Sequence, residues 1–325
     1  MGTAADAEDN GVDCNHEPLD FSLGHLALLH HLEHYMAKSP GSQLFPDEKH
    51  SGSFLETIFR AAVSAQYLID ELLAFSALHL STLAPDVSAR ERYSRQASQL
   101  QTRALMRFNS SRQEVGDGNC MAMFLFSSLL GMHIFFDAFV SRSEPTQVID
   151  KLVQYFNIHR GVRCITQQAW RSILQTEVCV IVGQFERLDQ AKSQQERADE
   201  DLDKLGSLFA AAEHHLSTTS LQACREAVES LRWALGQHKA LPWPYSIHVI
   251  LSWPVKASIE YVELLRQRCP EALLILAHWA VLLHYGREFW LFNDAGRFLV
   301  ESISGYLGSY WDEWMEWPKG MVNVA

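Results

Sequence analysis

The chain has 325 residues, of which 47% are hydrophobic and 20% are charged, and its formal charge is −12 at pH 7. This length and apolar content can bury a core without disulfides or a structural metal. The acidic balance argues against direct nucleic-acid binding, which needs a basic face. The six cysteines contain no Cys-x-x-Cys pair, which excludes an ordinary structural zinc site and is typical of reduced thiols in an intracellular protein, cytoplasmic or nuclear.

Helix signals dominate the chain, since no runs of alternating β-branched residues joined by a hairpin turn occur. The acidic residues 1–20 predict a disordered N-terminus that is neither a secretory signal nor a transit peptide. Apolar spacing and stop signals predict helices in this order: 23–36, 54–83, 87–109, 121–140, 146–158, 168–185, 205–235, 246–266 with a bend at Pro254, 270–284 and 294–317. We therefore expect a single all-α domain over 21–318, with an internal apolar ligand pocket, and a tail at 319–325.

Residues 121–140 test this interpretation, because twenty largely apolar residues match the length of a membrane-spanning helix. The segment contains His133 and Asp137 and has no basic flank. A carboxylate at membrane depth costs at least about 2–3 kcal/mol. We therefore expect a helix buried inside a helical domain and no membrane span.

Aromatic residues are concentrated near the C-terminus, where eight of the nine tryptophans follow Leu231. Such a density is typical either of a packed core or of the wall of a cavity for a bulky apolar ligand. The helix expected at 270–284 has no polar face, so its side chains either fill the core or line that cavity. The candidate ligand-binding residues are Phe124, Ser127, Ser128, His278, Trp279, Leu282, Leu283 and Trp290.

One pair of ionisable residues is a candidate for chemistry. His133 and Asp137 are four residues apart on one helix face, where the carboxylate can orient the imidazole as a general acid–base pair. The alternative is a hydrogen-bonded structural pair that ties two helices together. Similarly, a stripe of mostly small residues on the same helix permits either close helix packing or room for a ligand: Ser127, Ser128, Gly131 and Phe135.

Other chemistry lacks its motifs. His30, His31 and His34 have no H-E-x-x-H arrangement and no evident third ligand, so we expect no metal site. Glu301 has an ordinary partner in Arg297, four residues earlier. No dinucleotide fingerprint, Walker loop, G-x-S-x-G elbow or aspartate-rich cluster occurs, and we expect no cofactor.

Several segments match a known pattern as they stand: LLHH at 28–31, LHL at 78–80, FLFSSLLGMHIFFD at 124–137, YFNIHRGVR at 155–163 followed by Trp170, PEALLILAHWAVLLH at 270–284, Trp290, DAGRFL at 294–299 and WDEWMEWP at 311–318. Together they resemble the C-terminal regulatory domain of fungal binuclear zinc-cluster transcription factors, most closely the sterol uptake control type. The resemblance runs from about Leu19 to Pro318. It implies an all-α domain that holds a sterol-sized ligand in a helical pocket and often self-associates as a homodimer.

In such regulators a six-cysteine zinc cluster with a basic flank precedes this domain and contacts DNA, whereas this sequence begins with acidic residues and has no cysteine array. We therefore expect a regulatory domain, or a stand-alone relative without a DNA-binding module, that binds a sterol, terpenoid or polyketide. The alternative is a cofactor-independent cyclase or isomerase of fungal secondary metabolism that uses His133 and Asp137. A weaker alternative is a helical interaction partner with no ligand.

Overall fold

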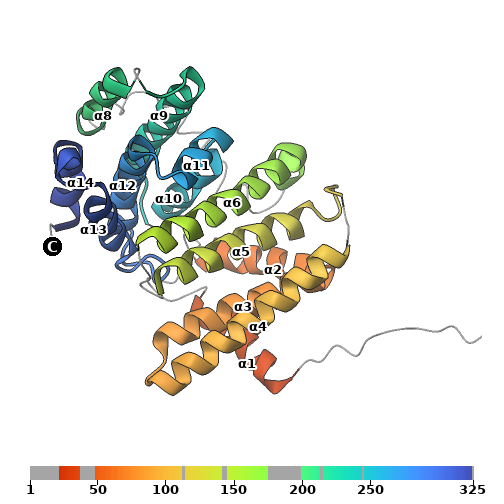
Figure 1. The fold of residues 1–325 in the computed structure, drawn as a ribbon. Helices are drawn as coiled ribbons and strands as arrows, with labels where there is room; N and C mark the ends of the chain where they lie inside the picture. Colours follow the sequence, from red (N-terminus) through yellow and green to blue (C-terminus); the bar gives the residue numbers. More distant parts are fainter. Residues whose placement is uncertain are drawn as a thin grey trace, which may run out of the picture.

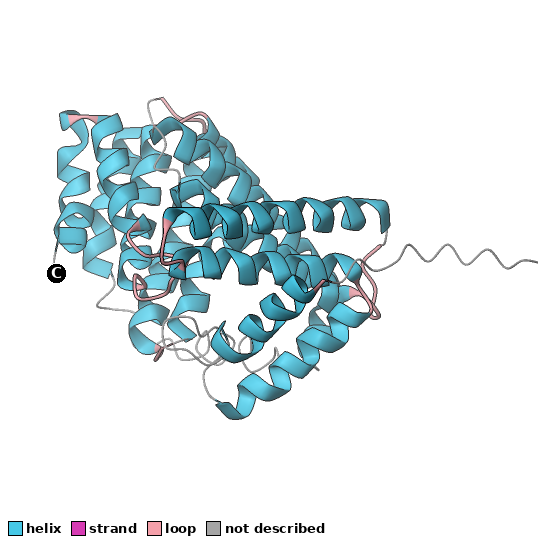
Figure 2. Cartoon of the chain, turned by 90° about the horizontal axis from the view of Figure 1, so that it is seen from below, coloured by secondary structure: helices cyan, strands magenta, loops and turns pink. Residues whose placement is uncertain are grey.

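The computed structural model describes residues 22–36, 48–111, 114–140, 145–174, 199–212, 215–243 and 245–323. Across these ranges the regular structure is helical and contains no strand, which confirms the all-α prediction (Figure 2). The α-helices are α1 (Leu23–His31), α2 (Glu48–Val63), α3 (Gln66–Leu83), α4 (Val87–Ser111), α5 (Cys120–Val140), α6 (Pro145–Leu174), α8 (Asp199–Ala212), α9 (Thr218–Ala240), α10 (Tyr245–Lys256), α11 (Ile259–Arg266), α12 (Pro270–Tyr285), α13 (Ala295–Leu307) and α14 (Asp312–Asn323).

The helices form three neighbouring groups (Figure 1). Helices α1 to α4 lie at one end, α5 and α6 run side by side through the middle, and α8 to α14 make up the other end. A π-helical turn, Leu32–Met36, continues α1, and a short 3-10 turn, Ser309–Trp311, joins α13 to α14. The middle pair therefore contacts both end groups, and α5 packs on α3.

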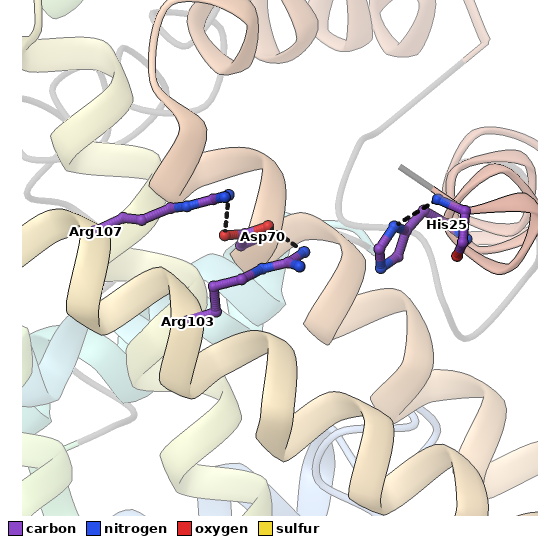
Figure 3. A network of polar contacts seen from close by, with 5 residues as sticks. His25, Asp70, Arg103 and Arg107 are labelled. Carbon is purple, nitrogen blue, oxygen red and sulfur yellow. Dashed lines mark hydrogen bonds and ion pairs between the residues drawn. The ribbon is translucent and has the colours of Figure 1, made fainter. Parts of the chain in front are cut away.

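Helices α3 and α4 are joined across their interface by a buried ion-pair cluster. Asp70 of α3 is fully buried, and its two carboxylate oxygens accept from Arg103 Nη2 at 2.7 Å and Arg107 Nη1 at 2.6 Å. Figure 3 shows both arginines reaching from α4 to this carboxylate. Because each oxygen has its own guanidinium donor, the buried charge is compensated, as a buried carboxylate requires.

Helix α5 is the one helix in the described ranges that is long and apolar enough to cross a membrane. Its most apolar window is 61% buried inside the protein, between α3 on one side and α6 on the other. This arrangement agrees with the prediction of a core helix at 121–140, which packs its apolar residues against protein.

A close approach at Gly131 joins α5 to α6. A Cβ atom at this position would lie 2.0 Å from Cε1 of His159, so the imidazole ring occupies the space that a side chain would need. His159 is fully buried, and its Nδ1 lies 3.3 Å from the carbonyl oxygen of Tyr155. The predicted packing role of this small-residue stripe is thus correct at Gly131.

Helix α6 corrects the sequence prediction. The pattern predicted a break at residues 159–161 between two helices, but α6 is continuous from Pro145 to Leu174. Glycine costs about 1 kcal/mol in a helix interior, and the burial of Tyr155, Phe156 and His159 just before Gly161 outweighs that cost. The part of the predicted 168–185 helix after Leu174, up to residue 185, lies outside the described residues.

Four helices predicted as single units are each two helices. The predicted 54–83, 205–235, 246–266 and 294–317 correspond to α2 with α3, α8 with α9, α10 with α11, and α13 with α14. Local caps explain the divisions: the hydroxyls of Ser217 and Ser258 accept from backbone N–H groups at the starts of α9 and α11. Gly308, at φ 76°, ends α13 in the left-handed region. Helix α14 continues to Asn323, beyond the expected domain end at 318.

Helix α12 is the centre of the C-terminal group. Every residue from Glu271 to His284 is buried, which confirms that a helix without a polar face is central. Helix α13 approaches it closely, because a Cβ at Gly296 would lie 2.4 Å from both the Ala280 carbonyl oxygen and the His284 nitrogen. Helix α12 therefore forms a rigid centre on which the neighbouring helices α9, α13 and α14 pack.

We predict opposite effects for two glycine-to-alanine substitutions in helices. Gly131→Ala should lower the free energy of unfolding by about 1–3 kcal/mol, because its methyl overlaps the His159 ring. Gly236→Ala in α9, where a Cβ meets nothing within 4 Å, should raise it by about 0.5–1 kcal/mol. Urea unfolding of both variants checks this, and equal shifts would contradict the packing described for α5 and α6.

Candidate functional site

Two fully buried ionisable side chains meet between α3 and α5. Glu71 Oε1 of α3 lies 3.5 Å from His133 Nδ1 of α5, and both side chains are 0% exposed. Neither carboxylate oxygen of Glu71 and neither ring nitrogen of His133 has a hydrogen-bond partner in the described part of the chain. A buried polar atom without a partner costs about 1–3 kcal/mol, so a pair with four such atoms is an unusual feature that calls for an explanation.

The electrostatics favour a neutral carboxyl group at this position. Burial raises the pKa of Glu71, an effect that the neighbouring His133 partly opposes and that Asp137 and Asp70 reinforce. Burial also raises the pKa of Asp137, with His133 and Lys151 acting in the opposite direction. Lys151 Nζ donates to the backbone oxygen of Asp137 at 3.0 Å. The arrangement can therefore hold or transfer a proton in an apolar surrounding.

The predicted pair of His133 and Asp137 is thus part of a larger group of ionisable side chains that includes Glu71. His133 is close enough to Asp137 to lower the pKa of that carboxyl, but Glu71 is the carboxylate at ion-pair distance. The sequence reasoning missed Glu71. A signal was present, because Asp70 and Glu71 are adjacent acids inside an otherwise apolar helical run, YLIDELLAF.

Trp290 lies beside this pair, in the segment 286–294 that links α12 to α13. Its ring centroid is 5.2 Å from that of Phe75, 4.9 Å from His79 and 5.6 Å from Phe136. The ring is partly exposed, yet the indole nitrogen is buried and has no hydrogen-bond partner among the described residues. Trp290 therefore combines an aromatic wall with an unused N–H donor.

The position of Trp290 relative to the Glu71–His133 pair follows from helix geometry. Phe75 is one turn after Glu71 on α3, and Phe136 is about one turn after His133 on α5. Both phenylalanine rings contact Trp290, so the indole packs on α3 and α5 about one helical turn beyond the residues of the acid–imidazole pair. We call Glu71, His133 and Trp290 the polar strip.

Two histidines border the aromatic end of the strip. His31 Nε2 lies 3.0 Å from His79 Nδ1 in a buried hydrogen bond between the end of α1 and α3. Burial lowers the pKa of His79 to about 4, and it also lowers the pKa of His31. Both rings are therefore neutral near pH 7, which allows one to donate and the other to accept.

The predicted ligand residues of α12 lie in the core. Trp279 is fully buried, stacks on Trp253 at 5.4 Å and donates its indole N–H to the Ile250 carbonyl at 3.2 Å. His278 stacks on Trp317 at 5.2 Å, and burial lowers its pKa to about 4. Leu282 and Leu283 are equally buried. A ligand-binding role for these four residues stays a prediction.

The predicted residues Phe124, Ser127 and Ser128 lie on α5, the helix that also carries His133 of the polar strip. Ser127 is buried, and Ser128 Oγ donates to the Phe124 carbonyl at 2.8 Å. Their part in ligand binding also stays a prediction. Glu301 pairs with Arg297 at 3.4 Å, as expected.

No group of three or more potential metal-ligating side chains lies close enough together to hold an ion in the described ranges. His30 and His34 instead stack on each other, with ring centroids 4.2 Å apart.

Comparison with known proteins gives one informative relative. A Zn(2)-C6 fungal-type transcription factor of Gibberella zeae is 27% identical over 269 residues, which cover 78% of this chain and 52% of the relative. The chain is related to a fungal transcription factor. It spans about half the length of that relative. No family model and no solved structure matches the chain. The comparison supports the broad resemblance to a fungal transcription factor and does not reach the narrower sterol uptake control type.

We predict that Glu71→Gln removes a pH-dependent contribution to the free energy of unfolding. A raised pKa in the folded state means that the Glu71 contribution is complete below the ordinary value of 4.5 and is lost as pH rises through the folded-state pKa. The wild type should therefore lose stability relative to Glu71→Gln as the pH rises above 4.5, the ordinary pKa of a glutamate. Urea unfolding across this range measures the difference.

The buried histidines away from the pair, His79, His159 and His278, affect both proteins equally and cancel in the subtraction, whereas His133 contacts Glu71 and is part of the measured difference. A stability difference that stays constant with pH would show that Glu71 is ionised in the folded protein.

Proposed function

We propose that this chain is the regulatory domain of a fungal-type transcription factor and that it binds a bulky apolar small molecule. The regulatory assignment is supported by the 27% identity to a fungal-type transcription factor. The proposed ligand class is a sterol, terpenoid or polyketide, and the proposed place is the face where α3, α5 and residues 286–294 meet. The protein would act in the cytoplasm or nucleus.

The observation that carries the ligand proposal is the setting of Trp290. Its ring is partly exposed among Phe75, Phe136 and His79, whereas its N–H is buried without a partner. Aromatic walls with a few convergent polar atoms are typical of small-molecule sites. A molecule bound against this ring would bury apolar area, at about 25 cal/mol per Å².

A chain of ring contacts would carry the binding event to the C-terminal group. Trp290 contacts Phe289 at 6.1 Å, Phe289 contacts Phe292 at 5.3 Å, and Phe292 contacts Phe135 of α5 at 5.7 Å. Phe135 in turn contacts Trp279 of α12 at 6.4 Å. Displacement of Trp290 would therefore be transmitted to α12, which is the kind of coupling a regulatory domain needs.

We predict that the purified wild-type protein retains apolar metabolites when it is produced in a fungal host, and that Trp290→Ala loses them. Extraction followed by unbiased mass spectrometry measures the retained molecules. Trp311→Ala is the matched control, because Trp311 is a partly exposed tryptophan whose ring contacts Tyr310 and Trp314 at the start of α14. Equal retention by both variants, or none by the wild type, would contradict the proposal.

A second candidate is a cofactor-independent cyclase or isomerase. The contact of Glu71 with His133 and the nearby Asp137 favours it, because a neutral carboxyl beside an imidazole is suited to acid–base catalysis. Incubation of an apolar metabolite mixture with wild type and with Glu71→Gln tests it by chromatography. A new product from the wild type alone would support the enzyme.

A further inference from the structure

The three members of the polar strip share one property that their surroundings do not explain. Both oxygens of Glu71, both nitrogens of His133 and the indole nitrogen of Trp290 are buried without hydrogen-bond partners in the described part of the chain. The other two buried indoles, those of Trp253 and Trp279, each donate to a backbone carbonyl, at 3.1 and 3.2 Å. Among the described residues, the indoles of Trp253 and Trp279 are therefore satisfied, whereas that of Trp290 is not.

The neighbouring acid shows that this part of α3 can satisfy a buried carboxylate when its role is structural. Asp70 precedes Glu71 directly, and it takes a guanidinium donor on each oxygen from Arg103 and Arg107. One position further along, Glu71 faces α5 and receives no such donor. The two adjacent acids therefore differ in role.

The chemistry of the strip selects for a neutral oxygen atom. A neutral carboxyl group can donate through its O–H and accept through its carbonyl oxygen, an imidazole ring carries an N–H donor, and an indole N–H donates only. Arg103 and Arg107 are not available to an anionic group, since Asp70 holds both of them. A hydroxyl or a carbonyl matches these donors and acceptors without adding a buried charge.

We propose that Glu71, His133 and Trp290 bind the oxygen-bearing end of the ligand, a hydroxyl or carbonyl carried on a bulky apolar skeleton. This inference rests on the proposed function. The aromatic rings of Phe75 and Phe136 hold the skeleton beside that oxygen, and the partly exposed Trp290 and Asp137 mark the side from which it enters.

The test compares two probes, cholestanol and cholestane, which share one skeleton and differ by a single hydroxyl. Each is delivered from methyl-β-cyclodextrin to the full chain, and affinity is measured from the rise in Tm with probe concentration. We expect the wild type to bind cholestanol about five- to tenfold more tightly than cholestane, the ratio that one net hydrogen bond provides.

Variants assign the preference to the strip. Glu71→Leu and Trp290→Phe should each bring the two affinities close together, whereas Glu71→Gln, whose amide still donates and accepts, should retain the preference. Glu271→Leu is the matched control: it removes another buried carboxyl group, which pairs with His215 at the start of α12, so it should lower stability but leave the ratio unchanged.

The outcomes separate the two proposals. Equal binding of both probes by the wild type would overturn the oxygen-binding role and leave the apolar ligand site standing. A preference that survives Glu71→Leu and Trp290→Phe would also overturn it. Binding of neither probe would count against a site for sterol-sized molecules, and the inference would fall with it.

Discussion

Helix α3 is buried against two neighbouring helices at once, and the adjacent acids Asp70 and Glu71, about 100° apart around the helix, face those two neighbours. Toward α4, Asp70 is neutralised by two arginines at 2.6 and 2.7 Å. Toward α5, Glu71 has only His133 at 3.5 Å. The first contact fixes the N-terminal group of helices. The second leaves buried polar atoms unsatisfied at the place where that group meets the rest of the protein.

Helix α5 connects the Glu71–His133 pair to the rest of the protein. Its small residue Gly131 admits the His159 ring and fixes the helix against α6, while its opposite side carries His133 toward α3. Phe135 and Phe136 of the same helix contact residues of the 286–294 segment, Phe292 and Trp290. A change at the Glu71–His133 pair would therefore alter contacts in two of the three groups of helices. This is why we propose the regulatory site at this position.

The fold class and several helices could be predicted from the sequence, because apolar spacing is a local property. Helix α12 begins at Pro270, as the proline at its first position indicated. The divisions of longer helices were missed, since single residues such as Ser258 and Gly308 decide them against a continuous apolar pattern. Glu71 was missed for a different reason: its partner His133 comes from another helix, and no local spacing encodes a contact between helices.

The indole N–H signal of Trp290 tests the central claim most directly. A ¹H–¹⁵N spectrum of the chain resolves the signals of its nine tryptophans, and Trp290→Phe identifies the one that matters. If cholestanol binds as proposed, the Trp290 signal moves downfield as its N–H gains an acceptor, while those of Trp253 and Trp279, already bonded to carbonyls, stay in place. A Trp290 signal that does not move when cholestanol raises the Tm would contradict the account.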